Sequence, residues 1–544
     1  NTGSIIPIYP LTSNLKNNGI DSRFLRRIIK TIKKSSISIN DHFEKNFLLE
    51  TNLIELKRAL NDIHFAKSLI DLNRAIERLK FDEHFFLQLY LAFKNQKNLK
   101  IKSKPCFQNS KFDKKIIEAL SFELTEAQHR AHTQIKNSLT NSSPMNCLLQ
   151  GDVGSGKTIV SILASSIAVE SNFQVAIMAP TEILARQHFL LAKKLFKTSI
   201  KIDLLSSKSE YKDRKRILKN LGNHKINIIF GTHSIFQKKV EFKKLGLIII
   251  DEQHKFGVNQ RKKLSDKGGP NCDILLMSAT PIPRTLTMTI YGDMDLSIIK
   301  EKPKFRKEVK TYTKLESKID EIIKFVKKEI KNGNQIFWVC PLIDESKKID
   351  HSSAIIKFKF LDKIFPKKVA LLHGKTDPIE KDLILNNFLN KKFDILVSTT
   401  IIEVGIDFPN ANVIIIENAN KFGLSQLHQL RGRVGRGNKE SSCILMFKSS
   451  LTENAKKRLS ILKKSNDGFE ISEEDMKLRG YGDILGFKQS GLKIFKLADP
   501  VLNENLFRLA ENEIKRIEKN NEDIGKFKTL MKLYDQADII NDIV

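Results

Sequence analysis

Between about residues 116 and 465, short runs of apolar residues alternate with longer mixed segments. This spacing predicts strands that are apolar on both faces, as in a parallel sheet covered by helices. The expected strands are 147–149, 174–178, 226–230, 245–250 and 274–277 in a first series, and 335–339, 369–372, 394–397, 413–416 and 442–447 in a second. We therefore expect two α/β domains in tandem, over residues 116–305 and 306–465.

The regions on either side are charged and have a helical pattern. Apolar residues recur at three- and four-residue spacing in 24–33 and 53–79, which predicts amphipathic helices. The polar stretch 95–114 is expected to be a linker that closes an N-terminal region, 1–115. Residues 466–544 are expected to hold helices around a Gly-rich loop at 479–491. The expected fold class is α/β, with two parallel-sheet domains between helical N-terminal and C-terminal segments.

The composition of the chain limits only its general class: the number of domains, the size of the core and the presence of membrane spans. A chain of 544 residues suggests three or four domains, and its 41% hydrophobic content can fill a sizeable core. No apolar run approaches the ~18 residues of a membrane span, and no secretion signal is visible. We therefore expect no membrane partner and a cytoplasmic location. Because the chain begins with Asn rather than Met, a fragment or a processed product is expected.

The formal net charge of +31 favours a polyanionic partner, most simply nucleic acid. A Lys-, Asn- and Ile-rich composition, as an AT-rich genome encodes, also contributes to it. The cysteines are scattered and include no C-x-x-C pair, so they fit neither a zinc site nor a disulfide framework. They are Cys106, Cys147, Cys272, Cys340 and Cys443.

One segment fits the phosphate-binding loop G-x-x-x-x-G-K-[ST] at every fixed position. It consists of Gly151, Asp152, Val153, Gly154, Ser155, Gly156, Lys157 and Thr158. The glycines let successive N–H groups point at phosphate oxygens, Lys157 adds a positive charge, and the Thr158 hydroxyl suits Mg²⁺. An expected strand precedes the loop and an apolar helix, 159–169, follows it. The segment predicts binding of a nucleoside triphosphate.

Two further strand ends carry candidate chemistry. Asp251 and Glu252 directly follow the strand 245–250, where Asp251 suits a second Mg²⁺ contact and Glu252 suits the attacking water. Acids at a strand end are also common helix caps, but the phosphate loop favours catalysis. Ser278-Ala279-Thr280-Pro281 ends another strand, where its hydroxyls suit hydrogen bonds to the acidic motif; alone, it reads as a turn.

Two polar motifs complete the candidate site. Gln128 opens the first helix of the first domain, and its amide suits an adenine edge, although most glutamines are simply solvated. The second domain carries Gln429-Leu430-Arg431-Gly432-Arg433-Val434-Gly435-Arg436. Its arginines suit the γ-phosphate of a nucleotide on the first domain; a basic turn or a nucleic-acid contact is the alternative.

Together these motifs resemble those of superfamily 2 helicases and translocases. Longer runs resemble the bacterial RecG family of ATP-dependent DNA helicases, over about residues 116–500. These runs are 178–188 (MAPTEILARQH), 231–237 (GTHSIFQ), 251–258 (DEQHKFGV), 278–286 (SATPIPRTL) and 399–407 (TTIIEVGID).

The resemblance implies two RecA-like domains, ATP and Mg²⁺ as cofactors, and branched duplex DNA as the partner of a monomer. Lys157 and Thr158 would then serve phosphate and metal, and Asp251 and Glu252 would serve metal and water. Gln128 would read adenine, and Arg433 and Arg436 would be arginine fingers. Thr181, Thr232 and His233 would lie on the DNA side.

The segment 469–491 resembles the hairpin and loop that this family shares with the transcription-repair coupling factor, and it is expected to link hydrolysis to translocation. Tyr481 and Phe487 replace the Pro and Thr of that pattern. The family also carries an oligonucleotide-binding wedge domain, which nothing here resembles, while 5–12 resembles the segment that follows the wedge. A fragment without the wedge and a lineage that has lost it are both open.

We therefore expect an ATP-dependent helicase or translocase that acts on forks and Holliday junctions in recombination and repair. One alternative is a transcription-repair coupling translocase, which Gln253-His254 and Ile8-Tyr9-Pro10 disfavour. An RNA helicase is disfavoured because Gln429-Leu430 stands where His-Arg is usual. A nucleotide-gated DNA clamp with little turnover is disfavoured by the presence of Glu252, Arg433 and Arg436.

Overall fold

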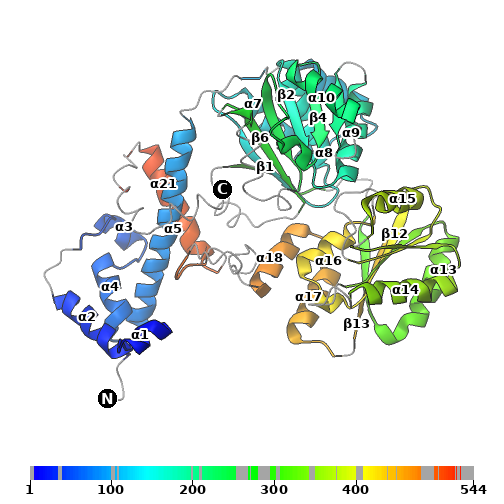
Figure 1. Cartoon of the computed structure of the whole chain (residues 1–544). Coiled ribbons are helices and arrows are strands. Elements are labelled where there is room, and N and C mark those ends of the chain that lie inside the picture. The colour runs from blue at the N-terminus through cyan, green and yellow to red at the C-terminus, as the bar shows by residue number, and fades with distance from the viewer. Residues whose placement is uncertain are drawn as a thin grey trace. The chain divides into compact units, whose positions relative to one another are not determined.

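The expected strands form two separate parallel sheets in the computed structural model of the chain (Figure 1). The structure describes residues 5–34, 39–99, 105–106, 110–197, 200–206, 211–252, 267–269, 271–279, 294–301, 307–341, 350–374, 376–399, 408–435, 437, 439–448, 450–479, 495–499, 502–520, 522 and 527. Both sheets belong to one compact unit, Gln96–Arg284 with Asp293–Arg479. The second unit combines Asn1–Asn95, Thr285–Gly292 and Gly480–Val544.

The first sheet has the strand order β3-β4-β2-β5-β6-β1-β7, and all its described pairs are parallel. Its strands are β1 (Asn146–Gly151), β2 (Gln174–Met178), β3 (Ile202–Leu205), β4 (Ile228–Gly231), β5 (Leu245–Ile250), β6 (Asp273–Ser278) and β7 (Asp295–Ile299).

Helices cover this sheet, as parallel strands require. They are α6 (Lys111–Ala119), α7 (Glu126–Thr140), α8 (Lys157–Glu170), α9 (Glu182–Phe196) and α10 (Tyr211–Gly222). One core joins Ile135 of α7, Leu163 of α8 and Phe196 of α9 to alternate residues of the strands, among them Val175 and Ile177. A short 3₁₀ helix, η1 (His233–Phe236), follows β4.

The second sheet has the order β10-β11-β9-β12-β13-β8, again with all described pairs parallel. Its strands are β8 (Val309–Leu315), β9 (Gln335–Val339), β10 (Val369–Leu372), β11 (Ile395–Ser398), β12 (Ala411–Ile416) and β13 (Ser441–Phe447).

Successive residues of β9 enter two different cores, which shows that both faces of this sheet are buried. Phe337 packs with α15 (Pro378–Leu389), α16 (Leu424–Arg431) and α17 (Glu453–Lys464), whereas Trp338 packs with α13 (Ile319–Lys331) and α14 (Asp350–Ile364). Two 3₁₀ turns, η3 (Glu316–Lys318) and η4 (Ala419–Lys421), lie in the connections. The expected α/β fold class with two parallel-sheet domains is confirmed.

Three strands were missing from the expectation: β3, β7 and β8. Each lies at the edge of its sheet. An edge strand is paired on one side only, so it needs no continuous apolar run. Tyr312 in β8, for example, remains 44% exposed.

The described residues of the second unit lie mostly in helices. It contains α1 (Ser13–Asn17), α2 (Ser22–Lys34), α3 (Lys45–Glu50), α4 (Leu56–Phe65) and α5 (Leu69–Leu99). The helical pattern expected over 53–79 falls on two helices: the chain leaves α4 at Ala66, where ψ is 137°, and α5 begins at Leu69. The expected linker at 95–114 is too long, because α5 continues to Leu99 and α6 begins at Lys111.

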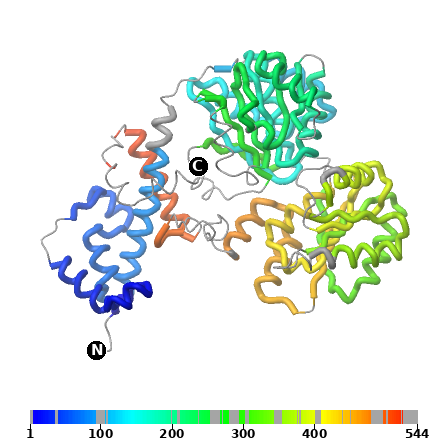
Figure 2. Tube along the Cα trace, in the orientation of Figure 1, coloured from blue at the N-terminus to red at the C-terminus, as the bar shows by residue number. Residues whose placement is uncertain are grey.

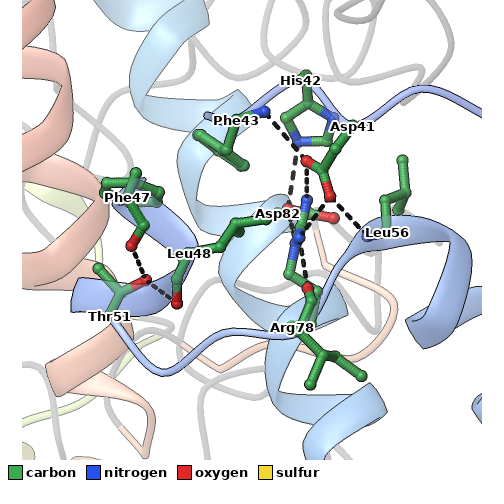
Figure 3. Close-up of polar contacts among 10 residues, drawn as sticks. Asp41, His42, Phe43, Phe47, Leu48, Thr51, Leu56, Arg78 and Asp82 are labelled. Atoms are coloured by element: carbon green, nitrogen blue, oxygen red, sulfur yellow. Dashed lines mark hydrogen bonds and ion pairs between the residues drawn. The ribbon is translucent and has the colours of Figure 1, made fainter. Parts of the chain in front are cut away.

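A buried ionic network holds these helices together (Figure 3). The guanidinium of Arg78 on α5 is fully buried and donates to Asp82 at 2.9 Å, to both carboxylate oxygens of Asp41, and to the carbonyl of Ile54 at 2.6 Å. His42 contacts the same Asp82 oxygen at 3.3 Å. The network ties the loop before α3 and the loop before α4 to the long helix.

Glu83 of α5 holds a C-terminal segment of the same unit. Its carboxylate accepts the backbone N–H groups of Lys496, Leu497 and Ala498 at 2.9–3.2 Å. Beyond it, α21 (Glu504–Lys519) packs Ile514 into the same core as Phe85 of α5. Figure 2 shows these two helices side by side.

The Gly-rich loop expected at 479–491 begins where α18 (Gly468–Arg479) ends; 480–491, with Tyr481 and Phe487, lies outside the described residues. The five cysteines are all free and buried. No helix in the described ranges has the length and apolar character needed to span a membrane.

Candidate nucleotide site

The candidate residues of the first sheet lie at the carboxyl ends of five neighbouring strands. Thr232 follows β4, Thr181 follows β2, Asp251 follows β5, Ala279 follows β6, and the phosphate loop follows β1. Because parallel strands all end at the same edge, sequence-distant motifs meet in this order. The DNA-side candidates therefore lie at one end of the row and the phosphate loop at the other.

The phosphate loop has the backbone that its glycines allow. Gly154 and Gly156 have φ values of 78° and 87°, in the left-handed region that side chains disfavour. The Lys157 ammonium donates to the carbonyls of Gly151 at 2.7 Å and Asp152 at 3.1 Å, so it points back into the loop. Thr158 lies in the first turn of α8, with its side chain half exposed.

The side-chain amide of Gln128 forms hydrogen bonds with two other residues of the chain. Its Oε1 accepts from the N–H of Thr125 in a capping box at the start of α7, and its Nε2 donates to the carbonyl of Ser155 at 2.8 Å. A Cβ atom at Gly156 would lie 2.2 Å from this Nε2, so the glycine also makes room for the amide. Gln128 thus holds the phosphate loop, and a contact with adenine stays a prediction.

Asp251 is held by three hydrogen bonds. Its N–H donates to the carbonyl of Met178 at 2.8 Å, its Oδ1 accepts from the N–H of Glu252 at 2.9 Å, and its Oδ2 contacts Nε2 of His188 at 2.9 Å. Burial acts to raise the pKa of this carboxyl, but the bond from His188 and the charge of Lys157 leave it below its ordinary value. The group is thus kept as a carboxylate, which suits a metal contact.

Glu252 has the opposite electrostatic character. Burial, and next the charge of Asp251, raise the pKa of its carboxyl, while Lys157 and Arg433 act to lower it. Its φ is +48°, a left-handed backbone that is unusual for a residue with a side chain. Such local strain occurs often at functional sites.

The motif after β6 contacts the acidic motif: the N–H of Ala279 donates to Oε2 of Glu252 at 3.2 Å. Hydrogen bonds from the hydroxyls of Ser278 and Thr280 to the acidic motif stay a prediction. Ser278 is fully buried at the strand end, and Thr280 lies outside the described residues.

The arginine motif reaches the phosphate loop within the same unit. His428 on α16 lies with Nε2 at 2.7 Å from Oδ1 of Asp152, and its Nδ1 lies 2.9 Å from a guanidinium nitrogen of Arg431. Since a guanidinium is always a donor, Nδ1 accepts and Nε2–H donates to Asp152. Gly432 approaches Val153 so closely that a Cβ would lie 2.9 Å from its side chain.

The two predicted arginine fingers differ in what the structure describes. Arg433 is 3% exposed, and its charge acts on the carboxyl of Glu252. Arg436 lies outside the described residues. Arg431 has a structural role: its guanidinium donates to the carbonyls of Leu462 and Ser465 at 2.7 and 2.9 Å.

A cavity of about 480 Å³ opens beside the contact between His428 and Asp152. Its lining includes Lys300, Lys307, Lys464 and Phe469, but not Lys157 or Glu252. The cavity thus adjoins the expected phosphate position rather than coinciding with it.

The DNA-side candidates have local roles as well. Oγ1 of Thr181 accepts from the N–H of Leu184 at 3.3 Å and so caps α9. Thr232 is half-buried just before η1, and His233 is exposed. Both positions are compatible with contacts to a phosphate backbone, which stay predictions.

Sequence reasoning gave no role to His188 or His428. His188 ends the run 178–188 and His428 directly precedes the arginine motif, but their partners, Asp251 and Asp152, lie on other elements. Gln253 and His254, the run 400–407 and the residues 280–286 lie outside the described residues.

Models of known families match three parts of the chain. A DEAD/DEAH box helicase model matches residues 125–289, and the helicase conserved C-terminal domain matches 317–438. The third, described as ATP-dependent DNA helicase RecG, domain 3, C-terminal, matches 465–536.

Curated relatives extend the match to almost the whole chain. The ATP-dependent DNA helicase RecG of Thermotoga maritima is 43% identical over 94% of this chain, and that of Bacillus subtilis is 43% identical over 92%. The chain spans 66% of the length of the first relative and 73% of the second.

Solved structures agree with this assignment. A structure of RecG bound to a three-way DNA junction aligns with a TM-score of 0.71 at 40% identity, covering 93% of this chain and 66% of that one. Dbp5 of S. cerevisiae bound to RNA and ADP BeF3 aligns with a TM-score of 0.50 at 20% identity, over 68% of this chain and 97% of that one; it shares the fold alone. The sequence identity, the RecG-specific C-terminal match and the paired parallel sheets all indicate that the chain belongs to the RecG family of ATP-dependent DNA helicases.

Proposed function

We propose that this chain is the motor of an ATP-dependent DNA helicase that moves on duplex DNA and remodels branched junctions in recombination and repair. The observation that carries the proposal is the arrangement around Glu252. The pKa of this carboxyl is raised by burial, and the charges of Lys157, at the start of α8, and Arg433, just after α16, act on it. The relatives named as DNA helicases, and the related structure bound to a three-way junction, support DNA as the partner.

In this proposal the loop from Gly151 to Thr158 binds the phosphates of ATP. The ammonium of Lys157 would exchange the carbonyls of Gly151 and Asp152 for phosphate oxygens, which are stronger acceptors because they are charged. Glu252 would orient and deprotonate the attacking water, a role that suits a carboxyl with a raised pKa. Arg433 and Arg436 would neutralise charge that develops on the γ-phosphate.

Mg²⁺ is the cofactor that these residues fit. The hydroxyl of Thr158 and the carboxylate of Asp251 supply oxygen ligands, which Mg²⁺ prefers, and the ion would neutralise phosphate charge when bound. Asp251 uses each carboxylate oxygen once within the protein, at Oδ1 and Oδ2, and further lone pairs are available. Gln128 would release Ser155, or share its amide, to contact adenine.

DNA would be held mainly through its backbone. Thr181, Thr232 and His233 would track one strand without reading sequence, and the net charge of +31 would strengthen the attraction. We further propose domains at 1–115, 116–305, 306–465 and 466–544, a cytoplasmic location and a monomeric motor.

The test is a strand-displacement assay on a three-way junction with one labelled strand. We expect release of the labelled strand that requires ATP and Mg²⁺, and none with Lys157→Ala. If the chain hydrolyses ATP on duplex DNA but releases no strand, the result would be compatible with a translocase and would contradict junction remodelling. Release by Lys157→Ala at the wild-type rate would contradict the site assignment.

A further inference from the structure

His188 is the one described side chain from another element that hydrogen-bonds the Asp251 carboxylate. The other bond to this carboxylate, from the N–H of Glu252 to Oδ1, comes from the next residue of the chain and turns with it. The contact from Nε2 of His188 to Oδ2, at 2.9 Å, comes from α9 and so limits rotation of the carboxylate relative to the sheet. Because an ionised carboxylate only accepts, Nε2–H is the donor.

The pair is shielded from water. His188 and Asp251 are each 7% exposed. If the hydrogen bond between them is broken, water cannot easily take the place of the lost partner, and the buried polar group is left unsatisfied at a cost in free energy. Charge-assisted hydrogen bonds of this kind are shorter and stronger than neutral ones, and burial strengthens them further.

The helix that carries His188 is itself fixed at the carboxyl end of β2. Thr181 caps it, and Leu184 and Ala185 in its first turns form a small buried cluster with Ala179, which follows the strand. The N–H of Asp251 donates to Met178 at the end of that same strand. Both the backbone and the carboxylate of Asp251 are therefore held by hydrogen bonds to the segment where β2 leads into α9.

We propose that His188 is a positioning residue, which orients the Asp251 carboxylate for its metal contact without touching nucleotide or metal itself. The inference rests on the proposed function, because it assumes that Asp251 serves Mg²⁺. Groups that orient a ligand to a metal are commonly worth about 10–100-fold in metal affinity or activity.

Two amide substitutions provide a matched pair. In His188→Gln, the side-chain nitrogen reaches about as far as Nε2 of histidine and can donate to Oδ2. In His188→Asn, the same amide stops at about the Nδ1 position and cannot reach it. Both remove the ring and keep a polar side chain, so loss of packing affects them alike. His129→Ala, at an exposed position on α7, is the control for histidine removal.

The readout that does not depend on turnover is binding of a fluorescent, non-hydrolysable ATP analogue, titrated with Mg²⁺ and repeated in EDTA. For His188→Asn, we expect the half-saturating Mg²⁺ concentration to rise about 10–100-fold, with binding in EDTA unchanged. His188→Gln should recover most of the wild-type value. In steady-state hydrolysis, His188→Asn should lower kcat at subsaturating Mg²⁺ and regain it at high Mg²⁺.

Equal Mg²⁺ dependence for the Asn and Gln variants and for the wild type would overturn the positioning role. Equal loss in both variants would also overturn it, because it would indicate packing rather than the hydrogen bond. A wild-type chain that binds the analogue with no dependence on Mg²⁺ would instead contradict the proposed function. The two failures are therefore distinguishable.

Discussion

Nε2 of His428, on a helix that covers the second sheet, lies 2.7 Å from Oδ1 of Asp152 in the phosphate loop. The histidine is held in turn by Arg431, which is anchored to two backbone carbonyls. The residue directly before the arginine motif thus contacts the loop that is expected to bind phosphate. The contact places the arginine motif close enough for Arg433 to act on Glu252.

Removing this contact should slow hydrolysis. A buried hydrogen bond to a charged group is worth about 1.5–3 kcal/mol, and 1.4 kcal/mol corresponds to a tenfold change. For His428→Ala we expect kcat for ATP hydrolysis in the presence of DNA to fall about tenfold or more, because the arginine motif is less well held against the loop. Steady-state kinetics measure this, with His129→Ala as the control. Unchanged kcat and KM would show that the contact has no part in turnover.

Glu252→Gln should separate binding from hydrolysis. The amide oxygen can still accept from the N–H of Ala279, so we expect the local structure to persist. The amide cannot take a proton from water, and loss of a general base typically costs about 10²–10⁴-fold in rate. Equilibrium binding of a fluorescent ATP analogue should be close to wild type, while turnover falls by that factor. A variant that retains at least half of the wild-type turnover would exclude Glu252 as the base.

The buried network around Arg78 should be essential for the helical unit. Arg78→Met leaves the buried carboxylate of Asp82 and the mostly buried one of Asp41 without their common partner. Loss of one member of a buried ion pair costs about 3–5 kcal/mol. Urea-dependent hydrogen exchange of α5 amides measures this. Arg508→Ala is the matched control, because Arg508 and Glu504 form an exposed pair and such pairs contribute less than about 1 kcal/mol. Equal effects of the two substitutions would contradict this account.

His84 should make the helical unit sensitive to acid. Its ring is fully buried against Phe495 and Phe507, with neither nitrogen hydrogen-bonded in the described part of the chain. Burial, and next the charge of Lys80, lower its pKa to about 3 from 6.5. The folded state therefore keeps this ring neutral, while the unfolded chain gains a proton as the pH falls below 6.5.

The contribution of His84 to stability is therefore complete above pH 6.5 and falls towards pH 3. One unit below the unfolded pKa, at pH 5.5, the loss is about 1.4 kcal/mol relative to neutral pH. We expect His84→Phe to reduce by about this amount the loss of stability between pH 7.5 and 5.5, measured by the exchange of α5 amides after correction for intrinsic rates. The same pH dependence in wild type and variant would show that another group is responsible.

The sequence predicts a strand well when both faces of that strand are buried. β2, β5, β9 and β10 have the expected bounds, because their apolar runs are continuous. The edge strands β3, β7 and β8 were missed because their side chains are mixed in polarity, whereas β10, which also lies at an edge, has a continuous apolar run. In the helical unit, the spacing of apolar residues indicated helices, but it could not show that the chain turns at Ala66.

The candidate site divides in a similar way. Local spacing indicates the phosphate loop, Asp251 and Glu252 as candidates, and the structure places them at neighbouring strand ends of one sheet; their roles stay predictions. The pairings of His188 with Asp251 and of His428 with Asp152 join elements that are distant in sequence, so no local pattern indicates them. Gln128 shows the same limit: its amide chemistry suggested adenine, whereas its neighbours in space are Thr125 and Ser155.

The site around Lys157, Glu252 and Arg433 is proposed to drive a motor on branched DNA. Its most direct test is the rate of ATP hydrolysis measured side by side with a forked duplex, plain duplex, single-stranded DNA, RNA and no nucleic acid, for wild type and Lys157→Ala. We predict that the forked duplex stimulates wild-type turnover most, that RNA stimulates little, and that Lys157→Ala shows no turnover. Stimulation by RNA alone, or stimulated turnover that survives in Lys157→Ala, would contradict the account.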